Sequence, residues 1–192
     1  MKNKVELPST FELQKELNRE NYKSKYKTIL KSTIYILLIV CAISVLIATL
    51  VFPVLKIYGT SMYPNLNKDD IVVASKKKEY KRGEIIAFYY NNRILVKRVI
   101  AVPGEWIEID DVGNVFINGE FLEEKYISDK SIGETDLKYP YQVTENTYFV
   151  MGDKRDTSID SRSSTIGTIK SEDIIGKIVF TVWPLAKFGV NK

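Results

Sequence analysis

Two residues of this chain have the chemistry of a nucleophile and of a base. Ser61 lies in the segment Gly-Thr-Ser-Met-Tyr-Pro, residues 59–64, and Lys97 is embedded in an apolar stretch, residues 94–100. The chain contains no histidine, which removes the Ser-His-Asp triad and the Cys-His pair. A serine nucleophile would therefore need another base, and lysine is the known substitute.

Each residue alone also has an ordinary structural explanation. Serines are common in turns, and a lysine often protects a sheet edge. The catalytic interpretation requires burial of Lys97, since burial that lowered the pKa from about 10.4 toward about 7–8 would let the neutral amine take a proton from a hydroxyl. Arg98 cannot act as this base because a guanidinium stays protonated.

A third polar segment, residues 151–162, contains three Asp, two Arg and two Ser. One interpretation is a solvated charge run on the surface. The other is a buried brace, because dense Asp/Arg alternation with hydroxyls favours charge-assisted hydrogen bonds that hold a site in place. In the second interpretation Ser158 orients the Lys97 amine.

The elements that must position these residues are short strands. Strand patterns after residue 56 alternate with the turn signals Asn91-Asn92, Pro103-Gly104 and Asn118-Gly119. The expected fold is mainly antiparallel β, with a smaller inserted β region at about residues 111–145 that we expect to be peripheral to the chemistry. The predicted strands are residues 70–74, 84–90, 94–102, 106–109, 115–117, 148–151 and 178–182.

Residues 33–55 contain no charged side chain, and a helix of about 20 such residues crosses the roughly 30 Å hydrocarbon core of a bilayer. A cleaved secretory signal and a buried core helix are the alternatives. Residues 1–32 carry eight Lys/Arg and four Asp/Glu, so the positive-inside tendency predicts a cytoplasmic basic tail at 1–32, a transmembrane helix at 33–55 and an extracytoplasmic domain at 56–192. We expect the tail to be solvated and partly disordered; a weak amphipathic helix that includes Phe11, Leu13 and Leu17 is the alternative. The same charge distribution argues against nucleic-acid binding, because the formal net charge of +4 lies wholly in the tail.

Several segments, taken in order, resemble the signature of bacterial type I signal peptidases, and the short single-span chain resembles their Gram-positive members. These segments are Gly-x-Ser-Met-Tyr-Pro, Asp-Ile-Val-Val, Val-Lys-Arg-Val-Ile-Ala-Val-Pro-Gly-Glu, and Gly-Asp-x-Arg-Asp-x-Ser-x-Asp-Ser-Arg, followed by Gly176 and Trp183-Pro184. The resemblance implies a membrane serine endopeptidase that removes signal peptides from exported preproteins, cleaving after small residues through an acyl-enzyme. It implies no cofactor and no metal, with preproteins and the lipid bilayer as partners.

The resemblance also assigns roles to residues. Ser61 would be the nucleophile and would supply an oxyanion amide, Lys97 the general base, and Ser158 its orienting partner. The supporting residues would be Arg98, Asp153, Arg155, Asp160 and Arg162, and the substrate pockets would be lined by Ile57, Met62, Leu66 and Val96. The chain departs from the family pattern at Gly59, where some members place a serine that lines the oxyanion hole, and at Asn65 and Lys154.

Two rival functions stay open. A self-cleaving repressor-type protease would share the Ser/Lys chemistry, but it predicts a cytoplasmic chain with a DNA-binding helical domain. An inactive homologue that serves as a membrane-bound chaperone or scaffold would be expected if the Ser/Lys pair had been lost. The sequence does not determine the oligomeric state.

Overall fold

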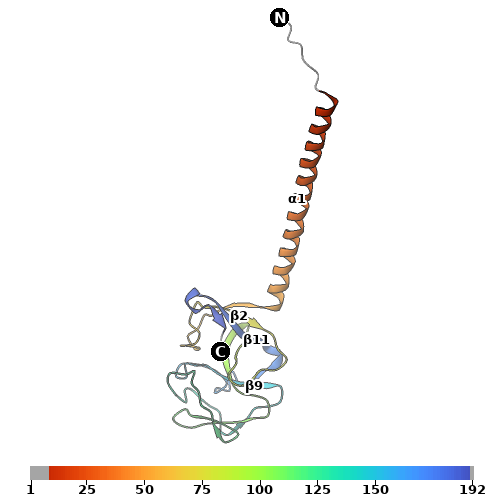
Figure 1. Ribbon diagram of the computed structural model, residues 1–192. Helices are drawn as coiled ribbons and strands as arrows, with labels where there is room; N and C mark the ends of the chain where they lie inside the picture. The colour runs from red at the N-terminus through yellow and green to blue at the C-terminus, as the bar shows by residue number, and fades with distance from the viewer. Residues whose placement is uncertain (1–8, 191–192) are drawn as a thin grey trace. The chain divides into compact units, whose positions relative to one another are not determined.

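The computed structural model describes residues 9–190 and divides into two units, one ending at Ala48 and the other beginning at Thr49. The first unit is helical and the second is mainly β. Figure 1 shows the long helix and the strands of the second unit. This agrees with the predicted fold class, an antiparallel β domain preceded by one apolar helix.

Helix α1 runs over Thr10–Val51, so it is longer than the predicted span of residues 33–55. It begins at a capping box, in which Ser9 N–H donates to Glu12 at 3.0 Å and Glu12 N–H donates to Ser9 Oγ at 3.4 Å. Residues 10–32 are exposed, as expected of a solvated tail, but they are helical, so the expectation of partial disorder is wrong for them; residues 1–8 lie outside the described residues. The expected end at Leu55 is also wrong, because Pro53 cannot continue a helix and Val54–Lys56 forms a strand.

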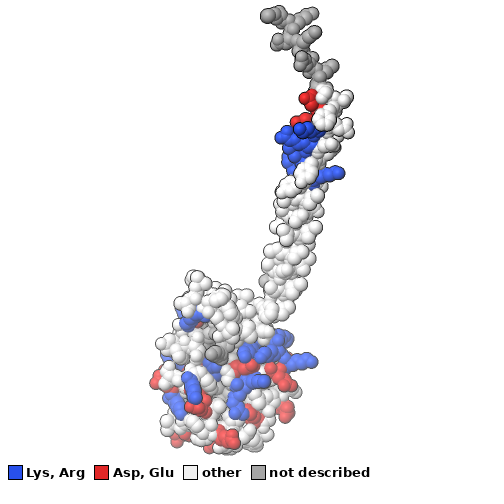
Figure 2. Space-filling view, viewed as in Figure 1, with Lys and Arg blue, Asp and Glu red and all other residues white. Residues whose placement is uncertain are grey.

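The charged side chains of α1 gather in its amino-terminal part, and an uncharged stretch follows them (Figure 2). Within Thr10–Ala48 the most apolar window reaches a mean hydropathy of 2.4, and none of that window is buried against other described residues. This helix is long and apolar enough to cross a membrane.

The main sheet of the second unit is antiparallel throughout. Figure 1 labels β2, β11 and β9 within it. The ten-residue strand β11 pairs with both β2 and β3, and the bulges along β11 bend the sheet. In spatial order the strands are β1 (Val54–Lys56), β2 (Ile71–Ser75), β11 (Ile174–Trp183), β3 (Ile85–Tyr90), β4 (Arg93–Ala101), β9 (Thr147–Met151) and β10 (Ile169–Lys170), with β12 (Gly189–Val190) paired to β11.

The predicted turns are present where they were expected. Asn91 and Asn92 have φ of 44° and 61° and join β3 to β4 as a two-residue hairpin, in which Tyr90 faces Arg93. Asn118 and Gly119, with φ of 52° and 82°, join the next hairpin in the same way. Left-handed φ at both central residues is the requirement of a type I′ turn, which Asn and Gly meet best.

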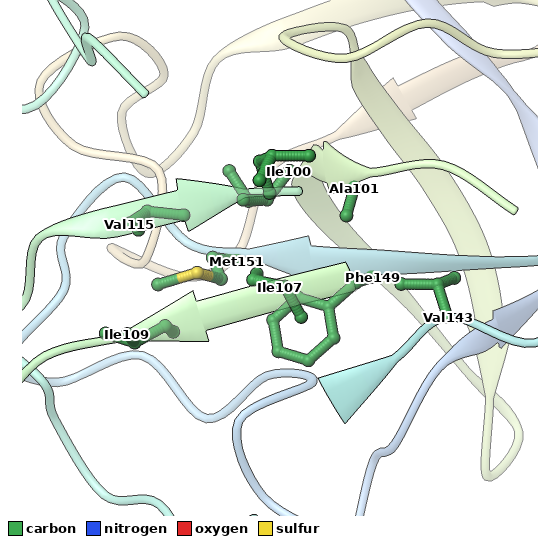
Figure 3. Packing of buried hydrophobic residues seen from close by; sticks show 9 residues of the cluster. Ile100, Ala101, Ile107, Ile109, Val115, Val143, Phe149 and Met151 are labelled. Atoms are coloured by element: carbon green, nitrogen blue, oxygen red, sulfur yellow. The ribbon is translucent and has the colours of Figure 1, made fainter. Parts of the chain in front are cut away.

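A second sheet packs against the first through a shared apolar core. Its order is β7 (Glu120–Phe121), β6 (Val115–Ile117), β5 (Trp106–Ile109) and β8 (Tyr141–Gln142). The core joins residues of β4 and β9 to residues of β5 and β6, and in Figure 3 Met151, Ile107 and Phe149 lie within it. Met151 is fully buried here, and it directly precedes the polar loop that carries the candidate site. The second sheet thus holds the end of β9 and the start of that loop.

Candidate active site

Ser61 lies in a turn that follows β1 and is anchored by its apolar neighbours. Ile57 and Met62 are 5% and 1% exposed and belong to the core under the turn, while Ser61 itself is partly exposed. Its carbonyl accepts a hydrogen bond of 2.9 Å from Lys154 N–H. Among the hydrogen bonds of residues 9–190, none engages the Ser61 hydroxyl or amide, so both groups are available to a ligand.

Lys97 lies on β4 and is buried, with 4% of its surface exposed. Its Nζ donates to Ser158 Oγ at 2.8 Å. Burial lowers the pKa of Lys97 from 10.5 to about 8; the Asp160 carboxylate opposes this shift, and the Arg162 charge adds to it. A substantial fraction of this amine is therefore neutral at mildly alkaline pH, as a general base requires.

The Asp160 carboxylate lies close enough to Lys97 and Ser158 to interact electrostatically with both. Burial alone would raise the pKa of Asp160, but hydrogen bonds and charge from Arg162, the Gly152 N–H and the Ser158 hydroxyl keep it below its ordinary value. The carboxylate therefore stays ionised, and its oxygens accept from Arg162 and from the Gly152 N–H. The Ser158 hydroxyl oxygen accepts from Lys97 at 2.8 Å, and this hydrogen bond orients the amine.

Ser61 and Lys97 open onto one groove of about 870 Å³. The hydrogen bonds of the described residues do not include one between their side chains; catalytic hydrogen bonds are often long before substrate binds. Two segments, one from β1 to Met62 and one from the β3–β4 turn to Lys97, form its walls. The lining residues are Val54, Leu55, Lys56, Ile57, Tyr58, Gly59, Ser61, Met62, Asn92, Arg93, Ile94, Leu95, Val96 and Lys97.

Three of the four predicted pocket residues, Ile57, Met62 and Val96, line this groove, and so does Gly59. Leu66 does not. It is 1% exposed and packs in the core beneath the turn with Val72 and neighbouring residues. The difference arises because the backbone turns back after Met62, where Leu66 N–H donates to the Met62 carbonyl at 2.8 Å.

Arg98, next to the lysine, is buried as well, at 3% exposure. It forms a bidentate ion pair with Asp153, with bonds of 2.8 and 2.6 Å, and it donates to the Gly83 carbonyl at 2.7 Å. The Tyr126 ring covers its guanidinium at 4.1 Å from the ring centroid. Because adjacent residues of a strand face opposite sides of the sheet, β4 buries Lys97 and Arg98 on different sides, each with its own hydrogen-bonding partners.

Two further buried ion pairs hold the loop of residues 152–162. Arg162 pairs with Asp160 at 2.8 and 2.9 Å, and Arg155 pairs with Glu124 at 2.9 and 2.5 Å. All four side chains are at most 1% exposed. The alternative of a solvated charge run is therefore wrong for these residues.

The second sheet region contributes directly to this network. Glu124 and Tyr126 lie within residues 111–145, yet they contact Arg155 and Arg98. The Tyr126 hydroxyl donates to Glu124 at 2.6 Å, and burial, reinforced by the Glu124 carboxylate, raises the pKa of Tyr126, which keeps the hydroxyl a donor. The expectation that this region is peripheral to the site is wrong.

Sequence reasoning missed a glycine that both parts of the site depend on. A Cβ built on Gly152 would lie 2.2 Å from Ser158 Oγ and 2.6 Å from the Ser61 carbonyl oxygen. Only a residue without a side chain fits between them. Asn65 was noted solely as a departure, but its Nδ2 donates at 2.7 Å both to Asp153 and to the Tyr126 carbonyl, linking the serine turn to the two other segments.

The chain is similar in sequence to known signal peptidases. Residues 30–183 match the family described as signal peptidase, peptidase S26. The chain is 33% identical over 173 residues to signal peptidase I S of Bacillus subtilis (strain 168), covering 84% of this chain and 92% of that protein. It is 33% identical over 149 residues to thylakoidal processing peptidase 1, chloroplastic, of Arabidopsis thaliana, covering 69% of this chain and 42% of the plant protein.

A solved structure, the signal peptidase I of Enterococcus faecalis V583, is 31% identical and has a TM-score of 0.44, covering 54% of this chain and 99% of that one. The family match extends over most of this chain. The Bacillus relative aligns with nearly its whole length. This chain therefore belongs to the signal peptidase family, peptidase S26, and is a serine peptidase of the signal peptidase I type.

Proposed function

We propose that this enzyme removes signal peptides from preproteins with Ser61 as nucleophile and Lys97 as general base. The observation that carries the proposal is a buried lysine amine, bonded to Ser158 at 2.8 Å and with its pKa lowered to about 8, on the same groove as a serine whose hydroxyl is free. Burial and a hydrogen-bonded partner are what a lysine needs to act as a base near neutral pH.

In the proposed reaction the neutral Lys97 amine takes the Ser61 proton as Oγ attacks the scissile carbonyl carbon. The tetrahedral intermediate collapses, the C–N bond breaks, and Lys97 returns the proton to the leaving amine. Water, deprotonated by the same lysine, then hydrolyses the acyl-enzyme. The Ser61 amide faces the oxyanion, and such a donor contributes about 3–4 kcal/mol in a comparable site.

The groove suits an extended peptide. β1 is the end strand of the main sheet, and residues 93–97 of β4 pair only with β3 among the described strands, since β9 joins from Arg98 onward. Two strand edges therefore face the groove, and a substrate segment can add to them by main-chain hydrogen bonds. Ile57, Met62 and Val96 supply apolar surface that favours small side chains next to the scissile bond.

Helix α1 is proposed to anchor the enzyme, with the amino terminus in the cytoplasm and the β unit outside. The support is the basic excess on one side of the apolar stretch, which follows the positive-inside tendency. Protease added to intact cells should degrade the β unit and spare the amino-terminal segment. Degradation of the amino-terminal segment with sparing of the β unit would contradict this orientation.

The test of the dyad is cleavage of a purified preprotein by the full-length enzyme in detergent. Ser61→Ala and Lys97→Met should each abolish cleavage. Ser171→Ala and Lys170→Met are matched controls: these residues lie near the 3-10 helix η1 (Ser171–Asp173), outside the groove lining, and should keep wild-type rates. Near-normal cleavage by either dyad variant would show that the assignment is wrong.

A further inference from the structure

We infer that Glu124 is a positioning residue that sets the Ser61–Lys97 geometry through Arg155 and the Gly152 peptide. The inference rests on the proposed dyad and extends the site into the second sheet region. The Glu124 carboxylate, on that region, reaches Arg155 in the loop of residues 152–162, and the Glu124 side chain is 1% exposed.

The first link is the ion pair between the two elements. Glu124 accepts two bonds from Arg155, at 2.9 and 2.5 Å, and a third bond from the Tyr126 hydroxyl at 2.6 Å. A bidentate Arg–carboxylate pair fixes direction as well as distance. The Arg155 guanidinium is therefore held in one orientation.

The second link runs from Arg155 to the backbone. Its remaining Nε–H donates to the Gly152 carbonyl at 2.9 Å, while the Gly152 N–H donates to Asp160 at 2.9 Å. Both ends of this residue are thus tied to charged side chains that are fully buried. The position of the Gly152 peptide therefore depends on the position of the Arg155 guanidinium.

The third link is contact. The Gly152 backbone lies between the Ser158 hydroxyl and the Ser61 carbonyl, so close that a Cβ would come within 2.6 Å of each. Two residues later, Lys154 N–H holds the same Ser61 carbonyl at 2.9 Å. A displacement of this backbone would move the nucleophile turn and the lysine's partner together. Misplacement of a catalytic group by about 1 Å can cost about a hundredfold in rate.

A merely stabilising role for the pair makes a different prediction. Removing one partner of a buried pair leaves an uncompensated charge, whereas replacing both with apolar side chains is often neutral for stability. If Glu124 and Arg155 only stabilise the fold, the doubly apolar variant should be active. If they position the dyad, it should be stable and slow, because the bond to the Gly152 carbonyl is gone.

The experiment measures kcat and KM for preprotein cleavage by the full-length enzyme, normalised to the folded fraction from thermal unfolding. Glu124→Gln should lower kcat about tenfold to a hundredfold with KM within about twofold, and the Glu124→Met, Arg155→Met double variant should show the same fall in kcat. Glu123→Gln is the matched control, since that neighbouring side chain is 71% exposed and pairs with Lys125 at the surface.

The double variant decides the question, including the case in which Glu124→Gln fails to fold. A kcat within about threefold of wild type in that variant would overturn the positioning role. Ser61→Ala, assayed in parallel, separates this inference from the proposal on which it rests. If Ser61→Ala cleaves normally, the dyad is wrong; if Ser61→Ala is inactive while the double variant has normal kcat, only the role of Glu124 is wrong.

Discussion

Raising the pH should increase the rate of cleavage by deprotonating Lys97, and the burial of this lysine sets the pH at which the rate rises. Burial lowers the pKa of Lys97 from 10.5 to about 8, a difference that corresponds to about 3 kcal/mol in favour of the neutral amine. With a pKa of about 8, about 9% of the enzyme carries a neutral amine at pH 7, roughly 300 times the fraction for an unperturbed lysine. We expect kcat/KM to rise about fiftyfold between pH 6 and pH 8 and to level off above pH 9.

The assay is the initial rate of preprotein cleavage, with preprotein well below KM, across pH 5.5–10.5, together with far-ultraviolet circular dichroism to confirm that the enzyme stays folded. Lys170→Met, with its exposed side chain, should reproduce the wild-type curve. A rate that keeps rising tenfold per pH unit up to pH 10, without levelling off, would refute the reasoning, because it would report a lysine that burial has not perturbed.

Other perturbations follow from the same geometry. Because the pKa of Lys97 is lower in the folded chain than in the unfolded chain, burial of the charged lysine destabilises the fold. This destabilisation is fully present below pH 8 and is lost as the pH rises toward 10.5. Lys97→Met should therefore raise the free energy of unfolding at pH 7 by about 1–3 kcal/mol while abolishing cleavage, as denaturant titration and the cleavage assay would measure. Gly152→Ala should lose about a hundredfold or more in kcat, because its Cβ collides with Ser158 and Ser61. Gly59→Ala, whose Cβ would meet nothing closer than 4.0 Å, should leave the free energy of unfolding nearly unchanged while Gly152→Ala lowers it, and equal free energies of unfolding for the two alanine variants would contradict the packing argument. Ser158→Ala should lower kcat at least tenfold, and an unchanged kcat would show that Lys97 needs no orienting partner.

Much of the β unit was predictable because its signals are local. Alternating apolar residues and the Asn-Asn turn identified the β3–β4 hairpin, and the Asn-Gly pair identified the turn after β6, since side-chain period and left-handed turn residues act over a few positions. The short strands β1, β7, β8, β10 and β12 were not predicted. Each has two or three residues, and a strand this short owes its conformation to its partner rather than to its own pattern.

Helix α1 extends further toward the amino end than the charge pattern predicts. The tail is exposed as expected, but it is helical rather than partly disordered, because the capping box at Ser9 and Glu12 begins a helix that continues into the apolar stretch. The helix ends at Val51, two residues before Pro53, which is a local stop signal. Both ends of α1 are thus set by local chemistry rather than by composition.

The sequence by itself determined which chemistry was possible. A chain without histidine, with Ser61 in a tight turn and Lys97 in an apolar strand, leaves lysine as the base for a serine nucleophile. Only the tertiary structure decided that both Lys97 and Arg98 are buried, that Leu66 lies beneath the groove, and that Glu124 reaches the loop of residues 152–162. The physical reason is that each partner comes from far along the chain: Lys97 meets Ser158 across 61 positions, and Glu124 meets Arg155 across 31. Burial and pairing at such separations depend on how the two sheets pack, which no local pattern encodes.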